Sequence, residues 1–161
     1  MANTARPSGF RPHGKVLRSN KYQAGSTCFP GDLVAMASDG QCDPVAAGST
    51  ILGAALNYAT VGQDLIVSDD PNQRYVVSVS AAAFDAQTDV GNNADHVATT
   101  GSTVYKCSAQ DLDSTTIAAS AAGLTILDFE HRIDNALGSR VDAIVKINEH
   151  QIIGVDAFAG V

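Results

Sequence analysis

Four histidines and 17 acidic residues are the side chains best suited to catalysis or metal binding in this chain of 161 residues. Three histidines follow an acid directly, at Asp95-His96, Glu130-His131 and Glu149-His150; the fourth is His13. Neighbouring residues of a strand point to opposite faces, so this spacing does not build acid–base pairs. A zinc site needs three or four converging ligands, and neither H-x-H nor H-E-x-x-H occurs. We expect histidines that face solvent or lie at sheet edges, and no metal or cofactor.

Two acidic stretches have the composition of a cation or acid–base site. The stretch 89–95 (DVGNNAD) resembles a calcium loop, but its twelfth position is Thr100, where an EF-hand has a bidentate Glu. Asp69 and Asp70 are adjacent carboxylates that lead directly into Pro71-Asn72, which is a turn sequence. Both stretches are therefore predicted to be turns.

Signatures of nucleophilic and phosphate chemistry are missing from the chain. It has no G-x-S-x-G, P-loop or G-x-G-x-x-G sequence. It also has no Trp, the residue that sugar sites commonly use for stacking. The sequence thus predicts a protein that is not an enzyme.

The cysteines Cys28, Cys42 and Cys107 are odd in number and lack C-x-x-C spacing. This pattern favours buried free thiols in a protein assembled in a reducing cytoplasm. A Cys28–Cys42 bridge is the alternative.

Positive charge is concentrated at the N-terminus. The first 22 residues contain five of the ten basic residues and no acid, and all 17 acids follow. Pro7 and Pro12 exclude a regular helix there. We therefore expect an extended basic arm over residues 1–25, disordered until it meets a partner, before a single domain over residues 26–161. The net charge of −7 argues against nucleic-acid binding, and no apolar run is long enough for a membrane.

Short apolar runs separated by turn residues make up the body. The predicted strands are 32–38, 41–45, 50–59, 64–68, 74–80, 102–108, 124–129 and 141–148. Asp39-Gly40 predicts a tight hairpin, and Gly53 within its strand predicts a bulge or close packing. Residues 81–84 are consistent with one helical turn. Many short strands without helical periodicity predict an all-β fold, a small β-barrel or β-sandwich.

Three motifs carry a resemblance to a known family. They are ILGAALNYA at 51–59, LIVSDDPNQRY at 65–75 and VKINEH at 145–150, with the 89–95 loop and Leu112–Thr115 between them. In this order they resemble the capsid cement or decoration proteins of tailed bacteriophages, over about residues 32–150. The resemblance implies a β-tulip or jelly-roll-like barrel on the outer surface of the virion, made in the host cytoplasm, that clamps neighbouring subunits of the major capsid protein.

The basic arm supplies the candidate capsid-binding residues: Arg6, Phe10, Arg11, Lys15, Arg18, Lys21 and Tyr22. A mobile arm of this kind can lie along an acidic coat surface or add a strand to it. A symmetric oligomer gains from engaging several sites at once. We expect a homotrimer at local three-fold positions, with a dimer at two-fold positions as the alternative.

Two other classes of function remain open. A host-surface or carbohydrate-binding module would need a concave polar patch with aromatic residues, drawn from Tyr22, Tyr58, Tyr75 and Tyr105. A small hydrolase on a β-barrel would need a pocket with converging carboxylates or a histidine-bound metal.

Overall fold

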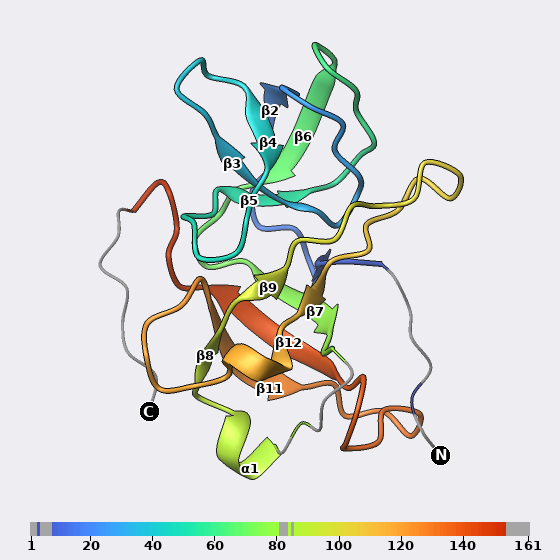
Figure 1. Cartoon of the computed structure of the whole chain (residues 1–161), viewed down its shortest axis with the longest axis vertical. Coiled ribbons are helices and arrows are strands. Elements are labelled where there is room, and N and C mark those ends of the chain that lie inside the picture. The colour runs from blue at the N-terminus through green and yellow to red at the C-terminus, as the bar shows by residue number, and fades with distance from the viewer. Residues whose placement is uncertain (1–2, 4–7, 81–83, 85, 154–161) are drawn as a thin grey trace.

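The computed structural model describes residue 3, residues 8–80, residue 84 and residues 86–153. In this part of the chain nearly all regular structure is β-strand. One short helix, α1 (Ala86–Asp89), and one 3-10 turn, η1 (Ser114–Thr116), interrupt it. The strands form two five-stranded antiparallel sheets and one two-stranded sheet (Figure 1). The predicted all-β class is confirmed.

The first sheet lies in the lower half of Figure 1 and has the order β1-β7-β12-β11-β8. Its strands are β1 (Arg11–Pro12), β7 (Arg74–Ser78), β12 (Asp142–Ile147), β11 (Leu124–Phe129) and β8 (Asn93–Ala94). The three long strands follow the predicted runs because β-branched side chains fit a pleated, half-buried surface. In β12, Ala143, Val145 and Ile147 are buried in one core cluster, as their alternation predicts.

The second sheet lies in the upper half of Figure 1 and has the order β2-β6-β5-β3-β4. Its strands are β2 (Asn20–Gln23), β6 (Asp64–Ser68), β5 (Gly53–Ala55), β3 (Leu33–Met36) and β4 (Cys42–Pro44). The predicted turn joins β3 to β4, with Gly40 at a φ of +80°. A parallel bridge from Ala24 to Cys42 brings the two edges of this sheet together.

Two predicted strands differ from the structure. The stretch 50–59 contains only β5, because the chain on both sides pairs elsewhere: Ile51 bridges to His150 and Ala59 to Cys28. Gly53 packs tightly, as predicted, since a Cβ there would overlap the carbonyl oxygen of Ser68. The stretch 102–108 is a protruding hairpin instead of a sheet strand. The proposed helical turn at 81–84 falls mostly outside the described residues.

Two hydrophobic clusters fill the molecule. The larger contains Phe10, Tyr75, Phe84 and the inward residues of β11 and β12. The smaller lies under the second sheet and consists mostly of Ala, Val and Cys, with Leu52 and Leu65 as its largest members. The two-stranded sheet, β9 (His96–Val97) with β10 (Asp111–Leu112), supplies Leu112 to the larger cluster.

Candidate functional site

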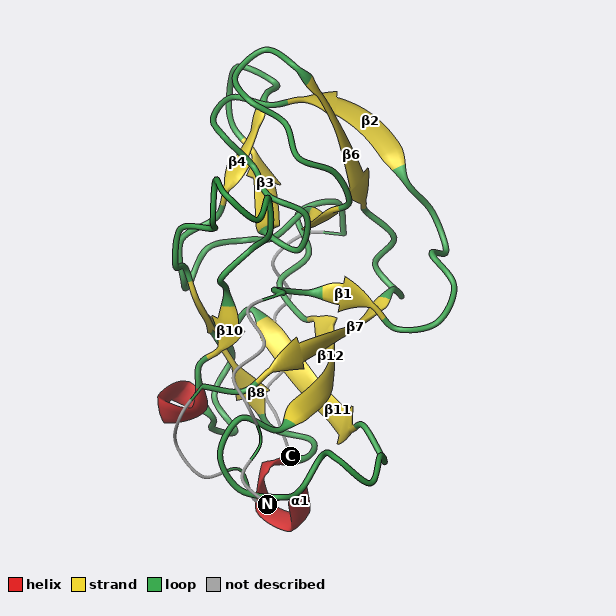
Figure 2. Cartoon of the chain, turned by 90° about the vertical axis from the view of Figure 1, so that its right-hand side faces the viewer, coloured by secondary structure: helices red, strands yellow, loops and turns green. Residues whose placement is uncertain are grey.

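The N-terminal segment, residues 8–24, belongs to both sheets. The sequence predicted an arm separate from the body, and the structure differs from that prediction. The segment's β1 pairs with β7 in the first sheet, and its β2 pairs with β6 in the second. Figure 2 shows β1 and β2 in different halves of the molecule, joined by a connection along one side. Backbone pairing and a buried side chain hold this segment in place, although its positive charge and its prolines predicted a free arm.

Phe10 is the apolar anchor of this segment. Its side chain is 1% exposed, lies in the larger core cluster and meets His96 edge-to-face at 6.3 Å. Its backbone N–H donates to the carbonyl of Gly31 at 2.8 Å. Gly9 precedes it at a φ of +60°, and a Cβ there would overlap Gly31 and Ser108. The close approach that seats Phe10 therefore needs glycine at position 9.

Asp69 is the polar anchor, at the end of β6. Its carboxylate accepts from Arg18 Nε at 3.0 Å, Asn20 Nδ2 at 2.7 Å and Tyr22 Oη at 2.6 Å. Arg18 also donates to the Asp69 carbonyl at 3.0 Å. Asp69 is 1% exposed, and burial alone would raise its pKa; the hydrogen bonds outweigh burial, so the pKa is lowered. Burial and the bond to Asp69 raise the pKa of Tyr22 to about 12.

Gln73 holds the connection between the two anchors. Its buried amide accepts from Leu17 N at 2.8 Å and donates to the carbonyls of Arg74 at 2.9 Å and Lys15 at 3.4 Å. It follows the predicted Asp70 turn, in which Asn72 N donates to the Asp70 side chain at 2.8 Å. The Asp-Asp-Pro-Asn-Gln motif thus fastens the N-terminal segment where the chain crosses between sheets.

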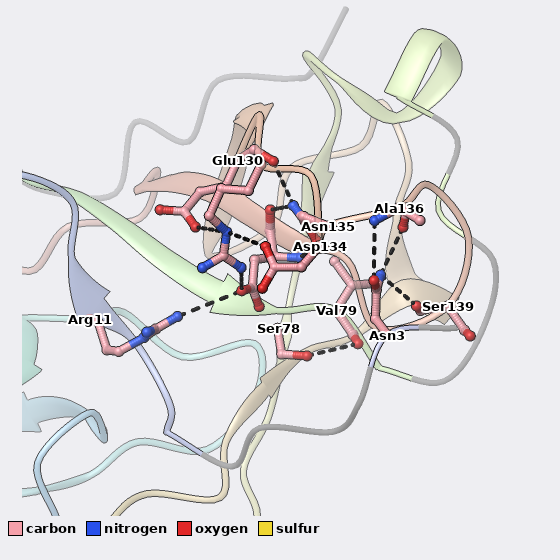
Figure 3. Close-up of polar contacts among 11 residues, drawn as sticks. Asn3, Arg11, Ser78, Val79, Glu130, Asp134, Asn135, Ala136 and Ser139 are labelled. Atoms are coloured by element: carbon pink, nitrogen blue, oxygen red, sulfur yellow. Dashed lines mark hydrogen bonds and ion pairs between the residues drawn. The ribbon is translucent and has the colours of Figure 1, made fainter. Parts of the chain in front are cut away.

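Asp142 binds the segment in the first sheet (Figure 3). Its carboxylate lies 3.8 Å from Arg11 and accepts from Arg132 at 2.6 Å. Arg132 also contacts Glu130 at 3.1 Å and Asp134 at 3.4 Å. Unlike the buried anchor at Asp69, this network is partly open to water.

Most of the predicted arm residues thus contact the body of the same chain. Phe10, Arg11, Arg18 and Tyr22 do so as described, and Lys21 pairs with the exposed Asp64 at 3.2 Å. Lys15 is exposed, and its backbone carbonyl accepts from Gln73 Nε2 at 3.4 Å. Arg6 lies outside the described residues. Sequence reasoning missed the roles of Asp69 and Gln73, although their motif was noticed.

Two histidines are buried, so the expectation that they face solvent is wrong for them, although His96 lies in an edge strand, β9. His96 bonds the Val45 carbonyl at 2.9 Å, and His150 Nδ1 accepts from Ile152 N at 3.1 Å. Burial lowers the pKa of both imidazoles. His13 is exposed, and His131 lies 3.3 Å from the exposed Asp128. Tertiary pairing of short strands, which adjacency in sequence does not reveal, buries His96 and His150.

The stretch 89–95 is a turn only in its first half, where Asn92 N donates to the Asp89 carbonyl at 3.2 Å, because Asn93–Ala94 form β8 of the first sheet. Its carboxylate at Asp95 accepts from Gly123 N at 3.2 Å and so has a structural partner. Among the described residues there is no group of three or more His, Cys, Asp or Glu side chains placed to hold a metal ion.

Free thiols are present at all three cysteines. Cys28 and Cys42 are buried in the smaller cluster, and burial raises the pKa of Cys28 to about 12 and of Cys42 to about 11. Thiols with such pKa values are poor nucleophiles at neutral pH.

The 102–107 hairpin protrudes between β9 and β10 (Figure 1, yellow). Val104 and Tyr105 at its tip are 80% and 81% exposed. Ser102 N donates to the Cys107 carbonyl at 2.9 Å, and Lys106, at a φ of +53°, places its ammonium 4.0 Å above the Tyr58 ring. These contacts fix the direction of the tip.

A cavity of about 250 Å³ opens at the root of this hairpin. We call it the socket. Its wall includes Phe29, Pro44, Val45, Ala46, Ala98 and Thr99. Gly101 also lines it, and a Cβ at Gly101 would overlap the Phe29 ring, so the hairpin root is packed closely onto this wall.

The other tyrosines are not free for stacking against a sugar. Tyr75 is 0% exposed, Tyr22 is bound to Asp69, and Tyr58 is packed against Phe29 at 5.4 Å between ring centroids.

Large apolar side chains are also exposed on the 130–140 loop, where Ile133 is 108% and Leu137 is 56% exposed.

No family model and no curated protein matches this chain. In the described part of the chain, no helix has both the length and the apolar character needed to cross a membrane.

Proposed function

We propose that this chain is a capsid decoration protein of a tailed bacteriophage. It binds the outer surface of the assembled head and ties neighbouring major capsid subunits together, without catalysing a reaction. The observation that carries the proposal is the display of large apolar side chains on separate protruding turns, at Val104 and Tyr105 and at Ile133 and Leu137. Exposed apolar side chains of this kind serve association with other macromolecules.

The way the two sheets are joined supports a clamping role. A clamp resists load only if its own halves stay together. The N-terminal segment crosses between the sheets, held by Phe10 on one side and by Asp69 on the other. The segment therefore stiffens the protein that would bear the load.

In this proposal, most positive charges of the N-terminal segment stabilise the chain itself and do not contact the capsid. Arg11, Arg18 and Lys21 face acids of the same chain. Lys15 is exposed, and between described residues it forms no ion pair, unlike Arg11, Arg18 and Lys21. We therefore assign capsid contact to Lys15 and the protruding turns, and structural roles mainly to Arg18 and Tyr22.

The sequence motifs at 51–59, 65–75 and 145–150 add support, since they resemble those of decoration proteins. A carbohydrate-binding module is less well supported, because Tyr105 is the only tyrosine of the four that is largely exposed.

Binding to shells tests the proposal. Purified protein is mixed with empty heads of the same virus and sedimented, and DNA release from full heads is recorded on heating with and without it. We expect saturable binding at a fixed ratio to capsid subunits and release at a higher temperature. A ligand of the assembled shell stabilises it by about 2.7 kcal/mol per site at a hundredfold excess over Kd.

A matched pair of variants sharpens this test. Lys15→Glu should weaken shell binding. The control, Lys21→Glu, makes the same change of charge at a residue that pairs with Asp64 of the same chain, so it should disturb that ion pair and weaken shell binding less. Absence of binding to heads would refute the proposal. Binding with unchanged DNA release would indicate a passive or host-binding module.

A further inference from the structure

We infer that two copies of this chain associate by exchanging their 102–107 hairpins, each tip entering the other copy's socket. The inference concerns self-association and does not depend on the proposed function. In the dimer, Val104 and Tyr105 are buried between the two copies, and capsid contact then rests on Lys15 and on Ile133 and Leu137 of the 130–140 loop. It follows from four features: the tip, the socket, their adjacency and the local charge.

The tip has the properties of an interface anchor. Val104 and Tyr105 together present a β-branched and an aromatic side chain, both about four-fifths exposed. Tyrosine is enriched among residues that dominate binding energy, because it buries a large area at low entropic cost. The bond from Tyr105 N to Ser102 Oγ at 3.2 Å and the seat of Lys106 on Tyr58 hold the tip in one direction. A preorganised tip pays little ordering entropy on binding.

The socket matches this anchor in kind. Its volume of about 250 Å³ has room for an aromatic ring, and Phe29, Pro44 and Val45 give it apolar walls. Asp32 lies in the same wall, and its carboxyl accepts from Phe29 N at 3.0 Å. Asp32 is 2% exposed, so it orders this wall without presenting a charge to an incoming tip.

Adjacency of tip and socket determines the symmetry. The chain lines the socket from Ala98 to Gly101 and reaches the tip three residues later. Because three residues span at most about 11 Å, the tip lies beside the socket. A face that carries an anchor beside its matching hole is self-complementary, and such a face forms a two-fold, isologous contact.

Charge favours this face for the approach of two copies. The chain carries a net charge of −7, so most surfaces of two copies repel. The hairpin and much of the socket come from three stretches without Asp or Glu: 24–31, 44–63 and 96–110. Within the last of these, Lys106 is the only Lys or Arg.

Sedimentation equilibrium of the purified full chain tests the inference. We expect a mass twice the 16.6 kDa of one chain at high concentration. The double variant Val104→Ser with Tyr105→Ser should raise the dimer dissociation constant at least tenfold. Its control, Ile133→Ser, removes an even more exposed apolar side chain from another loop and should leave the constant unchanged. Circular dichroism confirms that the variants fold.

A mixing experiment tests the reciprocal exchange. Ala46→Trp narrows the socket while leaving the tip intact, and should also weaken self-association. When this variant is mixed with the tip variant, one intact tip meets one intact socket, so a mixed dimer should form more tightly than either variant with itself. Failure to form a mixed dimer would overturn the exchange.

The remaining outcomes are also decisive. A monomer at every concentration, or a tip variant that dimerises like wild type, overturns the inference. A mass three times that of one chain overturns the two-fold arrangement in favour of a ring. If wild type is monomeric and the tip variant loses binding to heads, the tip contacts the shell and the second copy is not its partner.

Discussion

The two sheets hold the N-terminal segment by different forces. In the first sheet, Phe10 is buried in a large core, and the nearby ion pair from Arg11 to Asp142 is long and half-exposed. In the second sheet, the segment is held by a buried carboxylate, Asp69, with hydrogen bonds from three side chains.

The difference follows from the cores that each sheet offers. The first sheet packs on Tyr75, Phe84 and long aliphatic residues, and Phe10 adds to that cluster. The second sheet covers a thin core of small residues, with little room for another large side chain. Polar anchoring takes the place of apolar burial there, which makes this half more sensitive to pH and to the loss of a single acceptor.

The largest effect is expected from Phe10→Ala. Removing a fully buried aromatic ring leaves a cavity, so the free energy of unfolding should fall by about 4 kcal/mol. Urea denaturation measures the change. Leu17→Ala, in the same segment but 54% exposed, is the control and should change stability by less than about 0.5 kcal/mol. Equal effects of the two variants would contradict an anchor at Phe10.

Asp69→Ala should come next, at about 2 kcal/mol, because it removes the buried carboxylate that accepts from the exposed Asn20 amide and the half-buried Tyr22 hydroxyl. Asp64→Ala removes the same group from an exposed pair with Lys21 and should cost less than about 1 kcal/mol. Urea denaturation of both variants gives the comparison. A loss at Asp69 as small as at Asp64 would show that the buried carboxylate is not an anchor.

Acidification should have a smaller effect, in two stages. Burial lowers the pKa of His96 and His150 below the ordinary 6.5, so unfolded chains bind more protons and stability falls as the pH drops below 6.5. The lowered pKa of Asp69 gives a second loss, below pH 3.8. Burial raises the pKa of Asp32, which acts in the opposite direction.

Comparing variants therefore isolates the histidines. The double variant His96→Gln with His150→Gln lacks both imidazoles. The unfolding free energy of wild type minus that of this variant should therefore shrink as the pH falls from 7 to 5. The same difference measured at constant pH in higher salt should change little, because both rings are buried. A difference independent of pH would sink this prediction.

Arg11→Ala should have the smallest effect, about 0.5 kcal/mol, and the effect should diminish in high salt because the pair with Asp142 is half-exposed. Arg132→Ala removes a closer partner of the same carboxylate, at 2.6 Å, and should cost more. Thermal melts at two salt concentrations measure both. A larger loss from Arg11 than from Arg132 would reverse the ranking.

Much of the fold could be predicted from the sequence because strand identity is a local property. Runs such as 124–129 and 141–147 place apolar residues at alternate positions, as one face of a pleated strand requires. The turns at Asp39-Gly40 and Asp70-Pro71 depend on backbone preferences of the residues themselves. Such features need no knowledge of distant parts of the chain.

The roles of the candidate site residues required the tertiary structure. Arg18 looks like a free cation in sequence, and only the crossing of the chain between sheets brings it to Asp69, 51 positions away. The same holds for the burial of His150, which follows from its bridge to Ile51. Composition thus determined an all-β chain with an acidic body and a basic N-terminus. Long-range strand pairing decided which of those charges are neutralised inside the molecule, because Coulomb and hydrogen-bond energies depend on distance in space.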